Sequence, residues 1–313
     1  MNLFVSPELK RNDQQPDRDW LDDQMAGSVF RRVLGGIDAV FVTPMPKTPA
    51  LIQAGCTFLH RGQTCSATGV GAEPRLAVLR MAAEVCEIRA ERDRPDPLAG
   101  YGASESVGAA RTHAMLELIE RRSVRAWWSG QLLATEPTPD AIGRFKAACK
   151  RWPTKPAKAA SLLCVEAESF PPAFVAWSCD PGGFGFVFGA ACRLSKDDAI
   201  PAALRELRQM EFSLDLSARR SAAGHVLNTG EQARLARATR LDTRSDARLQ
   251  AHSQSANRSC DAPDDATFIA QTANDPDLCV EPLTPPDASI HVCRATSRNA
   301  GRATVADDPY CAF

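Results

Sequence analysis

The distribution of apolar and polar residues along the chain predicts strands and helices in alternation. VFRRVLGGIDAVFV from Val29 and ALIQAGCTFLH up to His60 are apolar stretches of strand length with turn residues between them. A helical pattern runs from about Glu73 to Arg89. A second helix begins near Ser106 and ends in two tryptophans that are predicted to pack in a core. DRPDP at 93–97 separates the two helices, because proline interrupts helical hydrogen bonding.

The second half of the chain continues this alternation. Residues 138–160 predict a short helix and a loop rich in Pro and Lys, and SLLCVEAE, AFVAWSCD and FGFVFGAAC predict three strands. The last of these leads into a third helix from Lys196 to about Leu214, and SIHVCRATS predicts one more strand near the end. Residues 217–274 are polar and predict one loose helix, Glu231–Arg240, within a linker.

The three long predicted helices share one internal pattern. An Ala is followed four residues later by Ala or Met, then after three residues by Glu, and after three more by Glu or Gln. A stretch that contains glycine precedes each copy. The copies are Ala77, Met81, Glu84 and Glu87; Ala110, Ala114, Glu117 and Glu120; and Ala199, Ala203, Glu206 and Gln209.

This pattern has a structural and a functional interpretation. In one copy alone, Glu117 and Arg121 are an i,i+4 pair on a solvated helix surface, which contributes a few tenths of a kcal/mol. Three copies with the same spacing favour a function instead. Carboxylates that converge repel one another and resist desolvation, so such a pocket requires cations. Oxygen ligands suit Mg2+, which usually carries a nucleotide phosphate when a few carboxylates hold it.

Composition narrows the classes of partner. The chain has 313 residues, 44% of them apolar, which is enough for one large domain or two small ones. Its 37 basic and 38 acidic residues nearly balance, so nothing indicates a nucleic acid or an anionic membrane as partner. The N-terminal region is polar, and no apolar run approaches the roughly 18 residues of a membrane span. These features predict a cytoplasmic protein.

Several common sites are missing from the sequence. The 11 cysteines are scattered without a Cys-x-x-Cys pair, which predicts small buried side chains rather than a disulfide framework. The five histidines are dispersed, which argues against zinc. The sequence has neither a phosphate-binding P-loop nor a Gly-x-Ser-x-Gly elbow. Helix carboxylates and metal would therefore have to hold any nucleotide.

The second copy, GYGASESVGAARTHAMLELIERRSVRAWW, resembles the YcaO family. Members of that family repeat a glycine-rich strand and a helix that bears Glu-x-x-Glu-Arg, and their third helix ends in Glu-x-x-Gln. The similarity runs from about Arg31 to Gln209 and, more weakly, over 278–295. It implies an α/β, YcaO-like domain of repeated strand–helix units whose helices carry convergent carboxylates. The single domain would occupy 28–313 after a flexible lead-in, 1–27, and 217–274 would be a polar, linker-like or loosely helical insertion.

The resemblance implies ATP- and Mg2+-dependent activation of peptide backbone amides. A nucleophile adds to the amide carbon, the amide oxygen takes the γ-phosphoryl group of ATP, and phosphate then departs to leave an azoline or a thioamide. The implied partners are a precursor peptide and a protein that captures it, because no peptide-recognition domain is recognisable in the sequence; a homodimer is one further arrangement. The alternative is a diverged, non-catalytic scaffold subunit of the same fold.

The resemblance also assigns roles to the repeated residues. Arg121 would be the catalytic residue and contact phosphate. Gln209 would contact the nucleotide or orient a ligand, and the alanines would let the nucleotide approach the helices closely. The carboxylates implied as Mg2+ ligands are Glu84, Glu87, Glu117, Glu120 and Glu206.

The sequence departs from the family pattern mainly at basic positions. Arg80 and Ile88 stand where the family has Ser and Arg in the first copy. Lys, Asn and Arg of the family are replaced by Val70, Ala99 and Ala202. Arg121 is therefore the motif arginine that remains in register, and the sequence leaves open whether these changes abolish catalysis.

Overall fold

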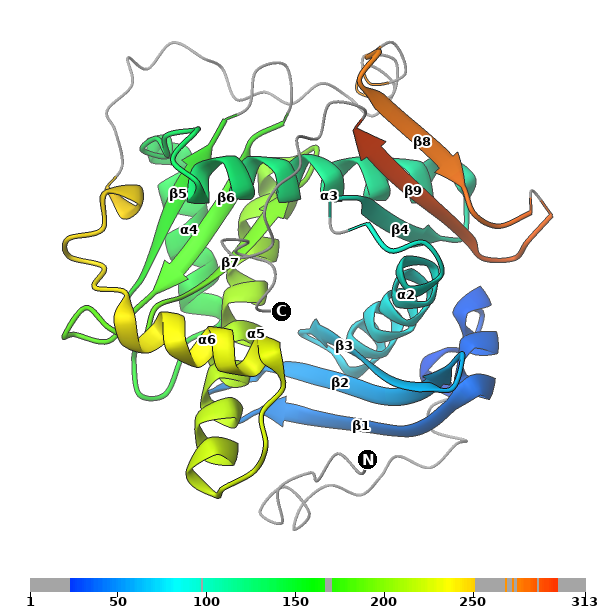
Figure 1. The fold of residues 1–313 in the computed structure, drawn as a ribbon, viewed down its shortest axis with the longest axis horizontal. Helices are drawn as coiled ribbons and strands as arrows, with labels where there is room; N and C mark the ends of the chain where they lie inside the picture. Colours follow the sequence, from blue (N-terminus) through cyan, green and yellow to red (C-terminus); the bar gives the residue numbers. More distant parts are fainter. Residues whose placement is uncertain are drawn as a thin grey trace. The chain divides into compact units, whose positions relative to one another are not determined.

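The structure is a computed structural model that describes residues 23–96, 98–166, 171–250, 268, 272, 275–285 and 287–297 (Figure 1). Its packing divides the chain into two compact units. Unit 1 is Met1–Met115 with Val280–Ala295, and unit 2 is Leu116–Cys279 with Thr296–Phe313. Most of the lead-in predicted for 1–27 and part of the insertion predicted for 217–274 lie outside the described residues.

Unit 1 is built on an antiparallel sheet in the order β1-β2-β3, whose strands are Ile37–Met45, Thr48–His60 and Gln63–Gly71. Helix α2 (Pro74–Asp93) packs on this sheet, and the core between them includes the fully buried Phe58, Val78 and Met81. The predicted break after this helix is confirmed, because α2 ends at Asp93.

The strand predicted from Val29 is wrong over its first part. Val29–Gly36 form the 3-10 helix η2, and strand β1 begins only at Ile37. Phe30 and Val33 are both buried, and their spacing of three residues puts them on one side of a helix with three residues per turn.

A second sheet of unit 1 joins segments that lie far apart in the sequence. Strand β4 (Gly100–Ser104) pairs antiparallel with β9 (His291–Ser297), and β8 (Leu278–Pro282) completes the order β4-β9-β8. The sequence predicted one late strand, whereas the structure has two, β8 and β9. The last strand itself is confirmed.

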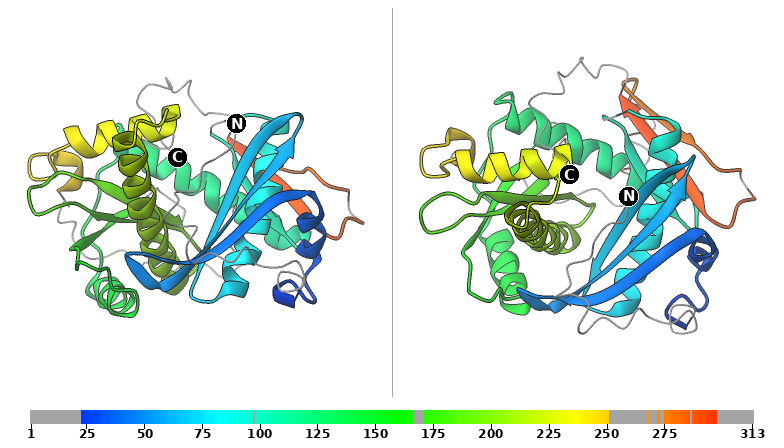
Figure 2. Two further views of the ribbon diagram at one scale, coloured as in Figure 1. Left: turned by 90° about the horizontal axis from the view of Figure 1, so that it is seen from below. Right: turned by 60° about the horizontal axis from the view of Figure 1, so that its bottom comes forward.

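Unit 2 contains the predicted strands β5 (Ala160–Val165), β6 (Ala173–Ser178) and β7 (Val187–Cys192) as an antiparallel sheet. Helix α5 (Lys196–Ala222) lies across this sheet (Figure 2). Helix α3 (Val107–Trp128) begins in unit 1 and continues into unit 2.

The shorter helices of unit 2 begin at residues that cap them. Helix α4 (Pro139–Arg151) has Thr138 as its N-cap, whose side chain accepts from the N–H of Ala141. Helix α6 (Thr229–Arg240) begins with a capping box between Asn228 and Glu231. The 3-10 helix η3 (Ala247–Leu249) follows it.

Two helix lengths differ from the sequence prediction. Helix α5 continues eight residues beyond Leu214, so the polar start of the 217–274 segment is helical rather than linker. Helix α6 begins at Thr229, two residues before the predicted start. Neither helix, nor any other in the described ranges, is both long and apolar enough to cross a membrane.

Of the two tryptophans at the end of α3, Trp127 packs in the core of unit 2 as predicted, and the half-buried Trp128 packs beside it. Trp127 is 1% exposed and donates from Nε1 to the carbonyl oxygen of Arg248 at 2.8 Å. Trp128 stacks on Phe186 and Phe188, with ring centroids 5.9 Å apart in both pairs. The guanidinium of Arg248 lies 4.0 Å from the centre of the Trp128 ring.

Each patterned helix packs closely against a glycine of a neighbouring strand. A Cβ atom added to Gly69 would lie 2.3 Å from Ala77 O and Met81 N, and one added to Gly102 would lie 2.4 Å from Ala110 O and 2.5 Å from Ala114 N. These contacts lie within unit 1.

The third copy, in unit 2, makes the same kind of contact one helical turn later. Its glycine meets the second Ala of the pattern rather than the first. A Cβ atom on Gly189 would lie 2.6 Å from Ala203 O and 2.2 Å from Leu207 N. The small residues of the repeat therefore let a strand backbone approach each helix.

Candidate functional site

Glu84 and Glu87 lie on α2 in unit 1. Glu84 is exposed, whereas Glu87 is half-buried and accepts a hydrogen bond of 2.9 Å from the backbone N–H of Ala103 on β4. Strand β4 is an edge of its sheet, so the N–H groups on its outer side have no strand partner there. Glu87 thus ties the first patterned helix to the strand that precedes the second.

The other three predicted carboxylates lie together in unit 2. Glu117 and Arg121 form an i,i+4 ion pair at 2.6 Å on α3, as the structural interpretation of the sequence predicted. Glu120 is 8% exposed on the same helix, and Glu206 is half-buried on α5. Gln209 is half-buried one turn further along α5.

Strand β7 connects Glu120 with Glu206. Because β7 is an edge of its sheet, N–H groups on its outer side need acceptors from outside the ladder. The N–H of Cys192 donates to Glu120 Oε2 at 3.1 Å, and that of Ala190 donates to Glu206 Oε2 at 3.2 Å. Alternate residues of one strand edge therefore hold carboxylates from two different helices beside each other.

Two carboxyl groups of this cluster, those of Glu120 and Glu206, have raised pKa values. Burial raises the pKa of Glu120 well above its ordinary value, and the charges of Glu206 and Glu117 raise it further. Burial also raises the pKa of Glu206 to about 7, although the charge of Arg193 opposes this increase. A group of acids in this state gains from any cation that binds among them, because the cation favours their ionised forms.

Arg193 is a member of this cluster that the sequence did not indicate. It follows β7 directly, its Nη1 lies 3.8 Å from Glu120 Oε2, and its side chain is 36% exposed. It was missed because it has no counterpart in the three-helix repeat. The one available signal was a basic residue between an apolar strand and a patterned helix.

The chemistry of these side chains fits Mg2+ and phosphate. Carboxylate oxygens are the protein ligands that Mg2+ prefers, and guanidinium groups match phosphate oxygens. Within either unit, however, the described residues contain no group of three or more His, Cys, Asp or Glu side chains arranged to hold a metal ion. The ligand set Glu84, Glu87, Glu117, Glu120 and Glu206 therefore stays a prediction, as do the roles of Arg121 and Gln209.

The positions that depart from the family pattern have structural roles. Ile88 packs against the core of unit 1, and Ala99 and Ala202 are 0% and 2% exposed. Arg80 donates from Nη1 to the carbonyl oxygen of Val70, and Arg89 lies over the ring of Phe58. An arginine restored at 202 would therefore have to enter a buried helix face.

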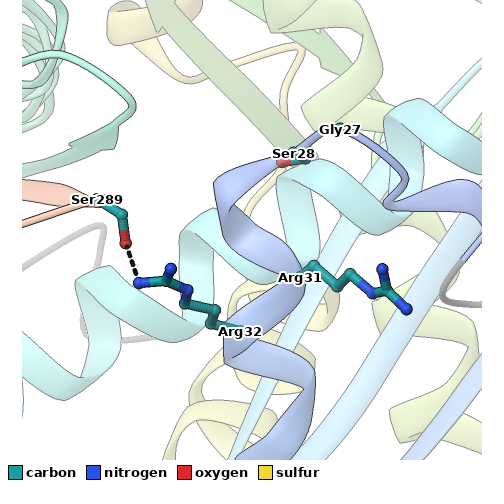
Figure 3. A pocket seen from close by; sticks show the side chains of 5 residues that line it. All are labelled: Gly27, Ser28, Arg31, Arg32 and Ser289. Carbon is teal, nitrogen blue, oxygen red and sulfur yellow. Dashed lines mark hydrogen bonds between the residues drawn. The ribbon is translucent and has the colours of Figure 1, made fainter.

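A separate hollow in unit 1 contains none of the predicted site residues. Gly27, Ser28, Arg31, Arg32 and Ser289 line it, and Arg32 Nη1 donates to Ser289 Oγ at 3.1 Å (Figure 3). Arg31 and Arg32 extend to opposite sides of η2, so their two charges do not converge. The hydroxyl of Ser28 accepts from the N–H of Phe30.

The fold is similar to those of solved proteins. YcaO from Methanopyrus kandleri bound with AMPPCP and Mg2+ matches with a TM-score of 0.57 and 13% identity, over 89% of this chain and 88% of that chain. A chain of the E. coli microcin synthetase McbBCD complex matches with a TM-score of 0.54 and 10% identity, over 82% of this chain and 86% of that chain. A search of curated protein sequences gives no match.

The sequence model of one protein family matches residues 96–297, which is more than half of the chain. That family is described as YcaO cyclodehydratase, ATP- and Mg2+-binding. The predicted α/β, YcaO-like fold is confirmed, and ATP and Mg2+ are confirmed as cofactors at the level of the family. The chain belongs to the YcaO family.

Proposed function

We propose that this chain uses ATP and Mg2+ to activate backbone amides of a ribosomally made peptide. Activation would lead to an azoline or a thioamide during maturation of the peptide, and would take place in the cytoplasm. Membership of a cyclodehydratase family supports the class of reaction. The choice between azoline and thioamide depends on the nucleophile, which is a Cys, Ser or Thr side chain of the peptide for an azoline and an external sulfide for a thioamide.

One observation carries the proposal. Unit 2 gathers Glu117, Glu120 and Glu206 with the guanidinium groups of Arg121 and Arg193 in a setting that penalises unneutralised carboxylates. A packed fold seldom keeps such groups together without a ligand, because paired buried acids cost free energy. Mg2+ would add a cation beside the three carboxylates, and the phosphates of ATP would add an anion beside the two guanidinium groups.

The residues of this cluster would share the work of binding and charge neutralisation. Bound ATP supplies the phosphoryl group that converts the amide oxygen into a leaving group. Glu117, Glu120 and Glu206 would hold Mg2+, Arg121 would contact phosphate, and Gln209 would contact the nucleotide. Their contribution is placement and electrostatic stabilisation rather than covalent chemistry. The Mg2+ roles of Glu84 and Glu87 are part of the same proposal.

The proposed partners are a precursor peptide and a protein that captures it. One structural neighbour is a chain of the microcin synthetase McbBCD complex, which supports an arrangement of several subunits. A homodimer of this chain is a further arrangement within the proposal.

A non-catalytic scaffold is the second candidate, and a specific observation favours it. Glu87, Glu120 and Glu206 each accept a backbone N–H from an edge strand, so these carboxylates serve the fold even without a ligand. Ile88 and the buried Ala202 also occupy places where the family has arginines, which reduces the positive charge available for phosphate.

Isothermal titration of the full chain with Mg2+-ATP tests the proposed site. The parent should bind, and the double variant Glu117→Gln, Glu120→Gln should bind at least about tenfold more weakly, since two charged ligands of Mg2+ are lost. Glu136→Gln is the matched control, because Glu136 is an exposed glutamate of the same unit. Equal affinities for the double variant and the parent would show that the site is wrongly placed.

A further inference from the structure

Arg193 occupies a position between the acidic cluster and solvent. Arg193 is the first residue after the edge strand β7, and the N–H of Cys192, the last residue of β7, donates to Glu120. The Nη1 of Arg193 donates to the carbonyl oxygen of Cys192 at 2.6 Å, a contact that fixes one terminal nitrogen and leaves Nε and Nη2 for other acceptors. The side chain is 36% exposed, so it is reachable from outside the cluster.

The guanidinium of Arg193 is hydrogen-bonded to the backbone of Cys192, and its interaction with Glu120 is one of charge without a hydrogen bond. The distance of 3.8 Å from Nη1 to Glu120 Oε2 is longer than a hydrogen bond. Arg121, in contrast, makes a close ion pair of 2.6 Å with Glu117. Of these two arginines, Arg193 would therefore lose less interaction energy with the cluster on turning to another anion.

A cation bound by the carboxylates would change what attracts Arg193. Arg193 interacts electrostatically with the carboxyl groups of Glu120 and Glu206. Mg2+ bound between these carboxyl groups would offset their attraction for the guanidinium. A phosphate group bound to the same Mg2+ would then offer the guanidinium a new anion. The planar fork of arginine matches two phosphate oxygens at once, which a point charge does not do.

We propose that Arg193 is a phosphate-binding residue of this chain, which contacts the terminal phosphates of Mg2+-ATP and adds a second positive charge to that of Arg121. The proposal rests on the proposed function, because it requires Mg2+-ATP at the cluster. It assigns the second charge to the end of a strand, not to one of the patterned helices.

Nucleotide titrations of Arg193 variants of the full chain test this assignment. Arg193→Ala should weaken Mg2+-ATP binding by about 10- to 100-fold, the loss expected for hydrogen bonds to a charged group. Arg193→Lys should lose less, because it keeps the charge but not the fork. Arg244→Ala is the control, since Arg244 is an exposed arginine of the same unit whose ion pair joins Asp242. The control should bind like the parent.

Adenosine monophosphate separates phosphate contact from a merely structural role. It lacks the terminal phosphates, so its affinity, measured for the parent at millimolar concentrations, should be the same in Arg193→Ala. Equal losses for both nucleotides, or no loss for ATP, would overturn the assignment of Arg193. If the parent itself binds no Mg2+-ATP, the proposed function fails together with this inference, whereas failure confined to the variants leaves the proposed function standing.

Discussion

Glu87, Glu120 and Glu206 each accept a hydrogen bond from the backbone N–H of a strand at the edge of its sheet. In the sequence they are members of a repeat that points to a ligand. In the structure they also take the place of a neighbouring strand, because an edge strand has donors without a partner in the ladder. A residue of this kind can hold a metal only with the oxygen lone pairs that its backbone donor leaves unused.

This backbone bond predicts different effects for two substitutions of Glu120. Glu120→Ala leaves the Cys192 N–H without its acceptor at a buried position, and the free energy of unfolding should fall by about 1–3 kcal/mol. Glu120→Gln keeps a carbonyl acceptor and replaces a buried carboxyl group that resists ionisation by a neutral amide, so the fall should be below about 1 kcal/mol. Urea denaturation of both variants beside the parent measures the difference. Equal losses for Ala and Gln would show that the hydrogen bond contributes nothing.

The sequence revealed the glutamates but only part of their surroundings. Their equal spacing in three helices is visible in one chain, and the Glu117–Arg121 pair follows from helix geometry alone. The approach of Cys192 N–H and Arg193 to Glu120 depends on how a strand more than 70 residues later is placed beside α3. No local pattern of the sequence encodes that placement.

At the scale of the elements, one strand glycine fits against each of the three patterned helices. Gly189 on β7 lies so close to α5 that an added Cβ would be 2.2 Å from Leu207 N. The alanines and the glycine together reduce the distance between strand and helix. In the first two copies this close packing involves the first Ala of the repeat. The role that the resemblance implies for the alanines in approach of the nucleotide stays a prediction.

Two glycines of unit 2 should respond in opposite directions to replacement by alanine. Gly189→Ala should destabilise the protein by about 1–3 kcal/mol or more, because the backbone of α5 must shift to admit the methyl group. Gly143→Ala should stabilise it by about 0.5–1 kcal/mol, because Gly143 is an exposed residue inside α4 and an added Cβ meets nothing within 4 Å. Thermal unfolding of both variants gives the two signs. A neutral Gly189→Ala would contradict the close packing.

The elements themselves were largely predictable from local patterns. Helical periodicity, the prolines after α2 and the apolar runs of β5, β6 and β7 located these segments correctly. The apolar pattern gave the wrong prediction at η2, because this short segment has apolar residues three apart and is also compatible with a strand. It failed again at β8, whose residues are only partly buried or exposed and therefore give a weak apolar signal.

At the scale of the whole molecule, the chain divides into two units although it was predicted as one domain after a lead-in. Unit 1 takes in Val280–Ala295 from near the end of the sequence, and β4 pairs with β9 across almost 190 residues. Such a pairing is set by long-range packing, so local propensity could not indicate it. The single-domain assignment stays a prediction, since compact units by packing and independent folding are different properties.

Whether the chain acts as an enzyme or as a scaffold depends on the whole molecule together with its partner protein. The proposed function pairs this chain with a separate protein that captures the precursor peptide. We therefore expect the chain alone to release little ADP in the presence of a precursor peptide. Peptide-dependent release should appear only when a protein that captures the peptide is added. Robust turnover by the isolated chain would contradict this expectation.

Arg121 decides between the two functions in that reconstituted complex. If the chain is the enzyme, Arg121→Ala should lower peptide-dependent ADP release by about a thousandfold, since a single arginine at a transferring phosphoryl group can contribute that much. Arg122→Ala is the matched control, because it removes a guanidinium from the next position of α3, about 100° around the helix. If the chain is a scaffold, both variants should leave the complex unchanged. A fully active Arg121→Ala complex would therefore remove the catalytic role of Arg121, while the hydrogen bonds of Glu87, Glu120 and Glu206 would still account for the carboxylates as parts of the fold.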